Sequence, residues 1–178
     1  QGPGSAPRQV PLAIVAGGTR TSRTPIVVGV NHRTGSLSLR DRLFVEDEAV
    51  PGFLDRLRES GVDQAVILST CDRVEVIAAS RDAGQDAAVI GEAFARHGDV
   101  ASDELGQALL TCAGTDAVRH LFRVAASLDS VVVGEPQVLG QVKACHRLAR
   151  DRGMVADDLE RLMQSAYTAA KRVRTETA

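Results

Sequence analysis

The most distinctive chemical feature of the sequence is a cysteine, Cys71, which directly follows the mainly apolar run AVILST at 65–70 and precedes Asp72 and Arg73. A buried strand that stops at such a residue presents its side chain on a rigidly held loop. A cysteine thiolate is a strong nucleophile, and a neighbouring cation such as Arg73 favours its ionised form. The pattern therefore indicates a candidate thiol nucleophile. The alternative interpretation, a buried structural cysteine, is the commoner fate of a single cysteine.

The other two cysteines do not extend this chemistry. Cys112 and Cys145 fall in stretches with helical patterns, and we expect both to be structural. The scattered positions of the three cysteines match neither a disulfide framework nor a zinc site, so we predict no metal.

Composition restricts the class of protein. The chain has 178 residues, 44% of them hydrophobic, and a formal net charge of -2. This length and composition predict one compact unit, and the charge leaves no broad basic surface for long nucleic acids, so any RNA contact must be local. No apolar run approaches the roughly 20 residues that span a bilayer, and no signal peptide is evident. We therefore expect a soluble, cytoplasmic protein without membrane contact.

The first residues differ from the rest of the chain. Residues 1–5, QGPGS, resemble the remnant of an affinity tag, and residues 6–24 are rich in Pro, Gly, Ser, Thr and Arg without any sustained period. Residues 1–24 are therefore interpreted as tag remnant and flexible lead-in, and residues 25–178 as the folded domain.

Hydrophobic periodicity predicts an α+β fold. Short β-branched runs predict strands at 26–30, 65–70 and 74–79, and helical spacing predicts a helix at 46–60. Further helices are expected at four places: 86–97, 115–128 with Thr115 or Asp116 as cap, from Pro136 onward, and after Asp157 or Asp158. The order indicates a small β-sheet with helices packed on it plus a mainly helical second half.

Four segments resemble successive signatures of one family. They are VGVNHRTGSLSLRDRL at 28–43, STCDRVEV at 69–76, HLFRVAASLDSVVVGEPQVLGQVK at 120–143 and KRVRTET at 171–177. In this order they are similar to the N-terminal catalytic domain of glutamyl-tRNA reductase, and they cover nearly the whole predicted domain.

The resemblance implies an enzymatic activity. In that family a cysteine thiolate attacks the ester of glutamyl-tRNA, and NADPH reduces the resulting thioester to glutamate-1-semialdehyde for tetrapyrrole synthesis. A thioester accepts hydride more readily than a carboxylate, so the scheme is chemically sound. The resemblance also implies glutamate-1-semialdehyde aminomutase as a candidate partner and a homodimer for the full-length enzyme.

The resemblance assigns roles to particular residues. It implies Cys71 as the nucleophile and His120 as a second catalytic residue that assists proton transfer. Arg73 is the candidate for bidentate pairing with the glutamyl carboxylate, and Glu135 for binding the substrate ammonium group. The remaining implied substrate-binding residues are Thr70, Asp72, Ser130, Pro136, Gln137, Gln141, Asn31, His32 and Thr34.

The sequence departs from the family in three respects. Asp72 replaces the usual asparagine, and an ionised aspartate beside the nucleophile disfavours the thiolate. Gly35 and Ser36 replace the usual Ala-Pro pair. No GxGxxG motif follows a predicted strand, so we expect the NADPH-binding and dimerisation domains to be absent from this chain, leaving a monomer or weak dimer. The alternative function is a catalytically altered, stand-alone relative that binds glutamyl-tRNA or transfers the glutamyl group without reduction.

Overall fold

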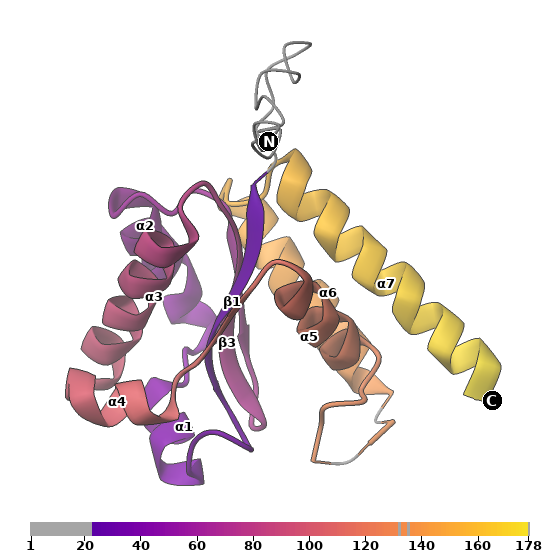
Figure 1. Ribbon diagram of the computed structural model, residues 1–178, viewed down its shortest axis with the longest axis horizontal. Helices are drawn as coiled ribbons and strands as arrows, with labels where there is room; N and C mark the ends of the chain where they lie inside the picture. The colour runs from indigo at the N-terminus through magenta and orange to yellow at the C-terminus, as the bar shows by residue number, and fades with distance from the viewer. Residues whose placement is uncertain (1–22, 132, 135, 178) are drawn as a thin grey trace, which may run out of the picture.

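The computed structural model describes residues 23–131, 133–134 and 136–177 (Figure 1). Within this part, four strands and several helices follow the chain in order. The elements are β1 (Thr24–Asn31), α1 (Leu37–Leu43), a 3₁₀ helix η1 (Asp47–Ala49), α2 (Val50–Glu59), β2 (Ala65–Ser69), β3 (Arg73–Ser80), α3 (Ala83–Gly98), α4 (Ser102–Ala108), β4 (Leu110–Ala113), α5 (Thr115–Ala125), α6 (Gln137–Asp151) and α7 (Asp157–Thr177).

The four strands form one antiparallel sheet in the order β2-β3-β1-β4. β1 and β2 run in the same direction with β3 between them, and the β2–β3 connection is a hairpin. This is the split βαβ arrangement of ferredoxin-like folds. The hairpin turn, residues 70–72, therefore lies at the same end of the sheet as the end of β1.

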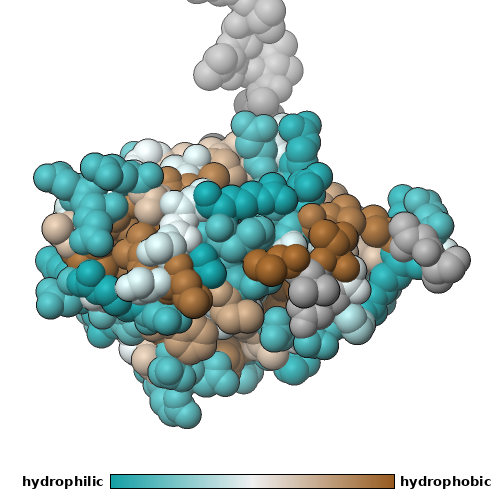
Figure 2. Space-filling view, turned by 90° about the horizontal axis from the view of Figure 1, so that it is seen from below, coloured by the Kyte–Doolittle hydropathy of each residue, from teal (hydrophilic) through white to brown (hydrophobic). Residues whose placement is uncertain are grey.

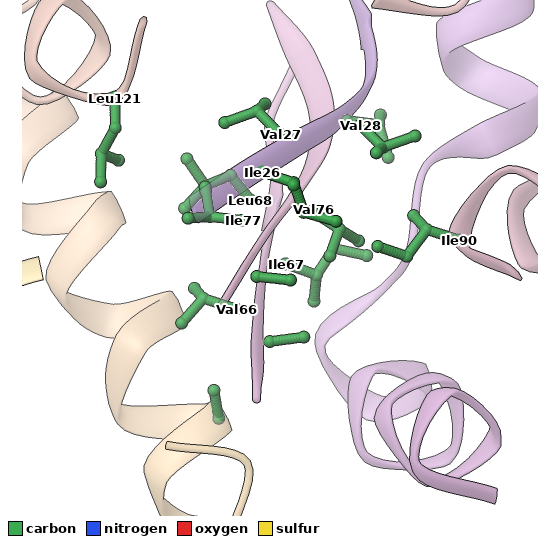
Figure 3. Packing of buried hydrophobic residues seen from close by; sticks show 14 of the residues in the cluster. Ile26, Val27, Val28, Val66, Ile67, Leu68, Val76, Ile77, Ile90 and Leu121 are labelled. Atoms are coloured by element: carbon green, nitrogen blue, oxygen red, sulfur yellow. The ribbon is translucent and has the colours of Figure 1, made fainter. Parts of the chain in front are cut away.

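Helices cover both faces of the sheet (Figure 1). Side chains alternate between the faces along each strand, and directly opposed residues of antiparallel strands share a face. Val28 lies opposite Val76 on the face covered by α3, where Ile90 packs, and Val27 lies opposite Ile77 on the face covered by α5 (Figure 3). The sheet is thus buried on both sides, which accounts for its nearly continuous apolar runs. None of the helices in the described part of the chain is long and apolar enough to cross a membrane.

The predicted α+β class and the three predicted strands are confirmed. β1 and β3 extend beyond the predicted ranges by one or two residues at each end, and β2 ends one residue earlier, at Ser69. The predicted helix at 46–60 is partly wrong, because a 3₁₀ turn precedes an α-helix that begins at Val50. Pro51 explains the boundary, since proline suits the first turn of a helix. β1 begins at Thr24, and Arg23 forms an ion pair with Asp63, so order starts within the range interpreted as lead-in. Residues 1–22 of that range lie outside the described residues.

Three elements and one cap differ from the prediction. Helix α4, Ser102–Ala108, was not expected. Helix α1 was not expected, and its N-cap is Ser36, whose hydroxyl accepts the Leu39 amide at 3.1 Å. Strand β4 was also missed, so the helical interpretation of Cys112 is wrong: this residue pairs with Val27 in the sheet. Helix α5 begins after Gly114, without the expected side-chain cap. The four residues of β4 were too few to show a period of their own.

Gly29 marks the closest contact between β1 and β3. It lies opposite Glu75, and a Cβ atom built on it would be 2.2 Å from the Val74 carbonyl oxygen and 2.5 Å from the Glu75 Cα. Both of these atoms belong to the backbone and cannot move independently. Because Gly29 has no Cβ atom, it leaves room for the β3 backbone and for the start of the Glu75 side chain.

We expect Gly29→Ala to lower the free energy of unfolding by about 1–3 kcal/mol or more, because the new methyl group overlaps the β3 backbone. Urea denaturation at neutral pH measures this change. Gly106→Ala, in α4, is the matched control, since a Cβ there meets no atom within 4 Å. The control should be neutral or stabilising by up to about 1 kcal/mol. Equal stabilities of the two variants would contradict the proposed overlap.

Candidate active site

The hairpin turn between β2 and β3 is held by several backbone contacts. The Thr70 amide donates to the Arg73 carbonyl at 2.8 Å, and the Asp72 amide donates to the Thr70 hydroxyl at 3.2 Å. From the neighbouring loop, the His32 amide donates to the Asp72 carbonyl at 2.9 Å. These bonds fix a short turn whose central residue, Cys71, is exposed.

Two charged side chains flank Cys71. Arg40 of α1 donates from Nε to the Cys71 carbonyl at 3.2 Å and from Nη1 to the Gly35 carbonyl at 2.8 Å. The Cys71 thiol lies 3.7 Å from Oδ1 of Asp72, and the other carboxylate oxygen of Asp72 accepts the Val131 amide at 3.3 Å. Arg40 thus anchors the turn to α1, and Asp72 anchors it to the segment that follows α5.

A pocket beside the turn contains six of the predicted site residues. They are Thr70, Cys71, Asp72, Arg73, Ser130 and Gln141. Its apolar walls come from β2, α5 and α6, namely Leu68, Val124, Val138 and Val142, and Cys145 completes the lining. The thiol of an exposed cysteine therefore shares a partly apolar pocket with several hydrogen-bonding groups, as an acyl-transfer site requires.

A buried carboxylate, Glu75, organises the floor behind the turn. It is 1% exposed, and it accepts Nη1 of Arg73 at 2.6 Å, Nε2 of His120 at 2.9 Å and Nδ2 of Asn31 at 3.3 Å. Burial opposes ionisation of Glu75, but the His120 hydrogen bond and the charge of Arg73 outweigh it and hold the pKa of Glu75 below its usual range. The sheet register places Asn31 opposite Arg73 on the same face as Glu75.

A second carboxylate, Asp129, completes this charged network. Its Oδ2 lies 3.2 Å from Nη2 of Arg73, its backbone carbonyl also accepts Nη2, and its Oδ1 lies 3.0 Å from Nη2 of Arg33. Burial again opposes ionisation, yet Arg73 and Arg33 hold the pKa of Asp129 below its usual range. Arg33 is exposed, whereas Asp129 and Arg73 are buried.

Arg73 lies in a different environment from the one the sequence predicted. Its side chain is 4% exposed, and both terminal nitrogens already contact carboxylates of the protein. A substrate carboxylate can pair with Arg73 only by replacing Asp129, because Glu75 lies deeper. The bidentate pairing of Arg73 with a glutamyl carboxylate stays a prediction, and it would compete with these two carboxylates of the protein.

The residues predicted around the NHRT loop mainly build the structure. Asn31 accepts the Arg33 amide at 2.9 Å through its side-chain oxygen, and the Thr34 hydroxyl accepts the Asn31 amide at 3.1 Å. The Nδ1 atom of His32 is buried and has no hydrogen-bond partner among the described residues. His120 contacts Glu75 rather than the pocket lining, so it reaches the pocket through Arg73.

The predicted residues around α6 separate into two groups. Ser130 is buried and lines the pocket with the exposed Gln141. Pro136 is the N-cap of α6, its carbonyl accepts Arg174 at 2.8 Å, and Gln137 is exposed outside the described pocket. Glu135 lies outside the described residues.

Sequence reasoning missed Glu75, Asp129, Arg40 and Cys145. Glu75 had a visible signal, since it is a lone charge inside the run VEVIAA of a buried strand, and such a charge needs partners. The other three are brought to the site only by packing between elements distant in the sequence.

The surface around this end of the sheet is mixed in character. Figure 2 views the molecule from the end that carries the hairpin turn, and apolar patches there alternate with hydrophilic ones. Exposed apolar side chains come from α1 and from the segment between α5 and α6, namely Leu37, Leu128, Val131 and Val133.

Comparison with known proteins identifies a family model and several relatives that match this chain. A family model described as Glutamyl-tRNAGlu reductase, N-terminal domain, matches residues 28–177. A glutamyl-tRNA reductase of Rhodospirillum rubrum is 45% identical over 152 residues, which cover 85% of this chain and 35% of the relative. One of Solibacter usitatus is 44% identical over 153 residues, covering 85% and 36%.

A solved structure agrees with these matches. Glutamyl-tRNA reductase from Methanopyrus kandleri superposes with a TM-score of 0.66 at 32% identity, over 85% of this chain and 34% of that protein. The chain thus spans about a third of the length of the relatives that it matches.

We expect Glu75→Gln to lower the free energy of unfolding at neutral pH by about 3–5 kcal/mol, because Arg73 loses a buried counter-charge. The depressed pKa of Glu75 means that its ionised form stabilises the fold above the unfolded carboxyl pKa of about 4, and that this stabilisation is lost as the pH falls through the folded value. Urea denaturation from neutral pH down to about pH 3 measures both effects.

The variant should therefore lose less stability on acidification than the wild type. The exposed Glu59 of α2 supplies the control Glu59→Gln, which should leave the pH profile unchanged. Parallel profiles for wild type and Glu75→Gln would contradict the role given to this carboxylate.

We expect Asp72→Asn to accelerate alkylation of Cys71 by iodoacetamide about fivefold at neutral pH. Asparagine removes the negative charge that lies 3.7 Å from the exposed sulfur, an interaction of about 1 kcal/mol between unit charges at this distance in water, and it keeps an oxygen for the Val131 amide. Peptide mapping reads the rate at Cys71, and Asp103→Asn on the exposed surface of α4 is the control. An unchanged rate in Asp72→Asn would show that this carboxylate does not act on the thiol.

Proposed function

The chain belongs to the glutamyl-tRNA reductase N-terminal domain family, and from that membership we propose that it carries the thiol centre at which glutamyl-tRNA is attacked. The observation that supports this most directly is the exposed Cys71, on a rigid turn, in one pocket with Thr70, Ser130 and Gln141. The ion pairs of Arg73 with Glu75 and Asp129 also support the proposal, because they hold Arg73 at the pocket wall.

The proposed chemistry is acyl transfer to sulfur. The ionised Sγ of Cys71 attacks the carbonyl carbon of the aminoacyl ester, a C–S bond forms, and the C–O bond to the tRNA ribose breaks. The departing ribose oxygen takes up a proton, and the product is a glutamyl thioester on Cys71. The hydroxyl groups of Thr70 and Ser130 are the lining groups able to donate to the developing oxyanion.

Recognition of the glutamyl group is proposed to use the remaining lining residues. The side-chain carboxylate of the substrate would replace Asp129 at Nη2 of Arg73, and Asp129 would keep its contact with Arg33. Gln141 and Asp72 are candidates for hydrogen bonds to the ammonium group, a role also proposed for Glu135. His120 is proposed to hold Glu75, and through it Arg73, rather than to contact the substrate.

The rest of the reductase reaction is proposed for the enzyme as a whole. NADPH supplies the hydride that converts the thioester to glutamate-1-semialdehyde, and we assign its binding to the two thirds of the relatives that lie beyond the matched region. A cytoplasmic location, homodimerisation and transfer of the aldehyde to glutamate-1-semialdehyde aminomutase belong to the same proposal and rest on family membership.

We expect incubation with glutamyl-tRNA, followed by an acid quench and intact mass spectrometry, to reveal one glutamyl adduct. Peptide mapping should place it on Cys71, because this is the exposed thiol of the pocket. Cys71→Ser should abolish the adduct, whereas Cys112→Ser, on β4, should retain it. An unmodified wild-type mass, together with intact folding, would refute the proposed acylation.

A further inference from the structure

A second thiol lines the pocket that contains Cys71. Cys145, on α6, is half-buried and unpaired, and the acyl-transfer scheme gives it no role. Cys112 lies instead on β4, at the opposite edge of the sheet from β2, and it does not line this pocket. The three cysteines therefore divide into a pair that shares one pocket and a third that is remote from it.

Cys145 lies against the outer edge of β2. The Thr70 amide bonds to β3, so alternation along the strand turns the Ser69 amide away from β3. The Cys145 sulfur interacts with that outward amide of Ser69. Because α6 packs along β2, the position of the Cys145 sulfur is set by the helix and does not depend on the hairpin turn.

The chain connectivity also limits how far Cys71 can lie from Ser69. Cys71 follows Ser69 by two residues, so its Cα lies within about 7 Å of the Ser69 Cα. A disulfide requires a Cα separation of about 4.4–6.8 Å, so the bond forms only if the pocket walls that carry Cys71 and Cys145 approach to that distance.

The two thiols differ in their surroundings. Cys71 is exposed at the tip of the turn, whereas burial raises the pKa of the Cys145 thiol. Oxidants react first with accessible cysteines, and an adjacent protected thiol can then attack the oxidised sulfur. Cys71 is therefore the thiol that meets an oxidant, and Cys145 is the one that remains reduced beside it.

We propose that Cys145 is the resolving thiol for Cys71, and that a peroxide converts the pair to a reversible intramolecular disulfide. The Cys71 thiolate attacks one peroxide oxygen, the O–O bond breaks, and Cys71 becomes a sulfenic acid as hydroxide leaves. Cys145 Sγ then attacks the Cys71 sulfur, an S–S bond forms, and the sulfenic oxygen leaves as water with the Cys145 proton. One peroxide is reduced, and two thiols are oxidised.

The disulfide has a consequence for the thiol centre that rests on the proposed function. It removes the nucleophile from the acylation reaction, and it protects Cys71 from irreversible oxidation to the sulfinic and sulfonic acids. A dithiol reductant restores both thiols by exchange. The pocket thus holds a reversible redox switch at its own nucleophile.

Hydrogen peroxide in stoichiometric amounts, with no other ligand, tests the proposal directly. The wild-type chain should lose two hydrogen atoms in its non-reduced intact mass, and peptide mapping should find Cys71 joined to Cys145. Cys112→Ser should behave in the same way. In Cys145→Ala the disulfide should be absent, and when the peroxide is raised to at least three equivalents Cys71 should instead accumulate two or three oxygen atoms.

Other outcomes would overturn the proposal. These are a bond between Cys71 and Cys112, a bond between the Cys71 thiols of two chains, or equal over-oxidation of Cys71 in wild type and Cys145→Ala. The wild-type map alone decides whether the disulfide forms, so the test does not depend on how well Cys145→Ala folds. Mass mapping also needs no tRNA, so failure of this inference and failure of the proposed acylation are separately visible.

Discussion

The buried charge of Glu75 is the constraint that determines how the active-site end of this fold is built. A carboxylate at 1% exposure is stable only when donors surround it, and here Arg73, His120 and Asn31 supply them from β3, α5 and β1. Satisfying one charge thereby ties three elements together. The same donors fix the start of β3, and so they fix the turn that carries the thiol.

Arg73 extends this constraint from the core to the pocket. Its second terminal nitrogen meets Asp129, which in turn meets the exposed Arg33, so a chain of alternating charges runs from the protein interior to solvent. Under the proposed function, a ligand carboxylate at this site would exchange for an existing carboxylate instead of meeting a free cation. Such an exchange favours ligands whose carboxylate matches the geometry of the guanidinium group. The ligand must replace every contact that the displaced carboxylate made with Arg73.

Much of the fold followed from local sequence patterns, and the exceptions have physical causes. The strands around Val28, Ile67 and Val76 were evident because a sheet buried on both faces leaves continuous apolar runs. Strand β4 was missed because four residues show no reliable period, and its existence depends on pairing with β1. Helix α1 was missed although its cap, Ser36, was visible, because the helix has only seven residues.

The family, the position of Cys71 after a buried strand and the α+β class could all be predicted from the amino-acid sequence, because each is encoded in contiguous residues. The packing of distant elements encloses Arg73 between Glu75 and Asp129, connects His120 to the pocket through Glu75 and Arg73, and places Cys145 in the pocket of Cys71. These are contacts between elements far apart in the chain. They arise from packing and charge pairing in three dimensions, and no local pattern records them.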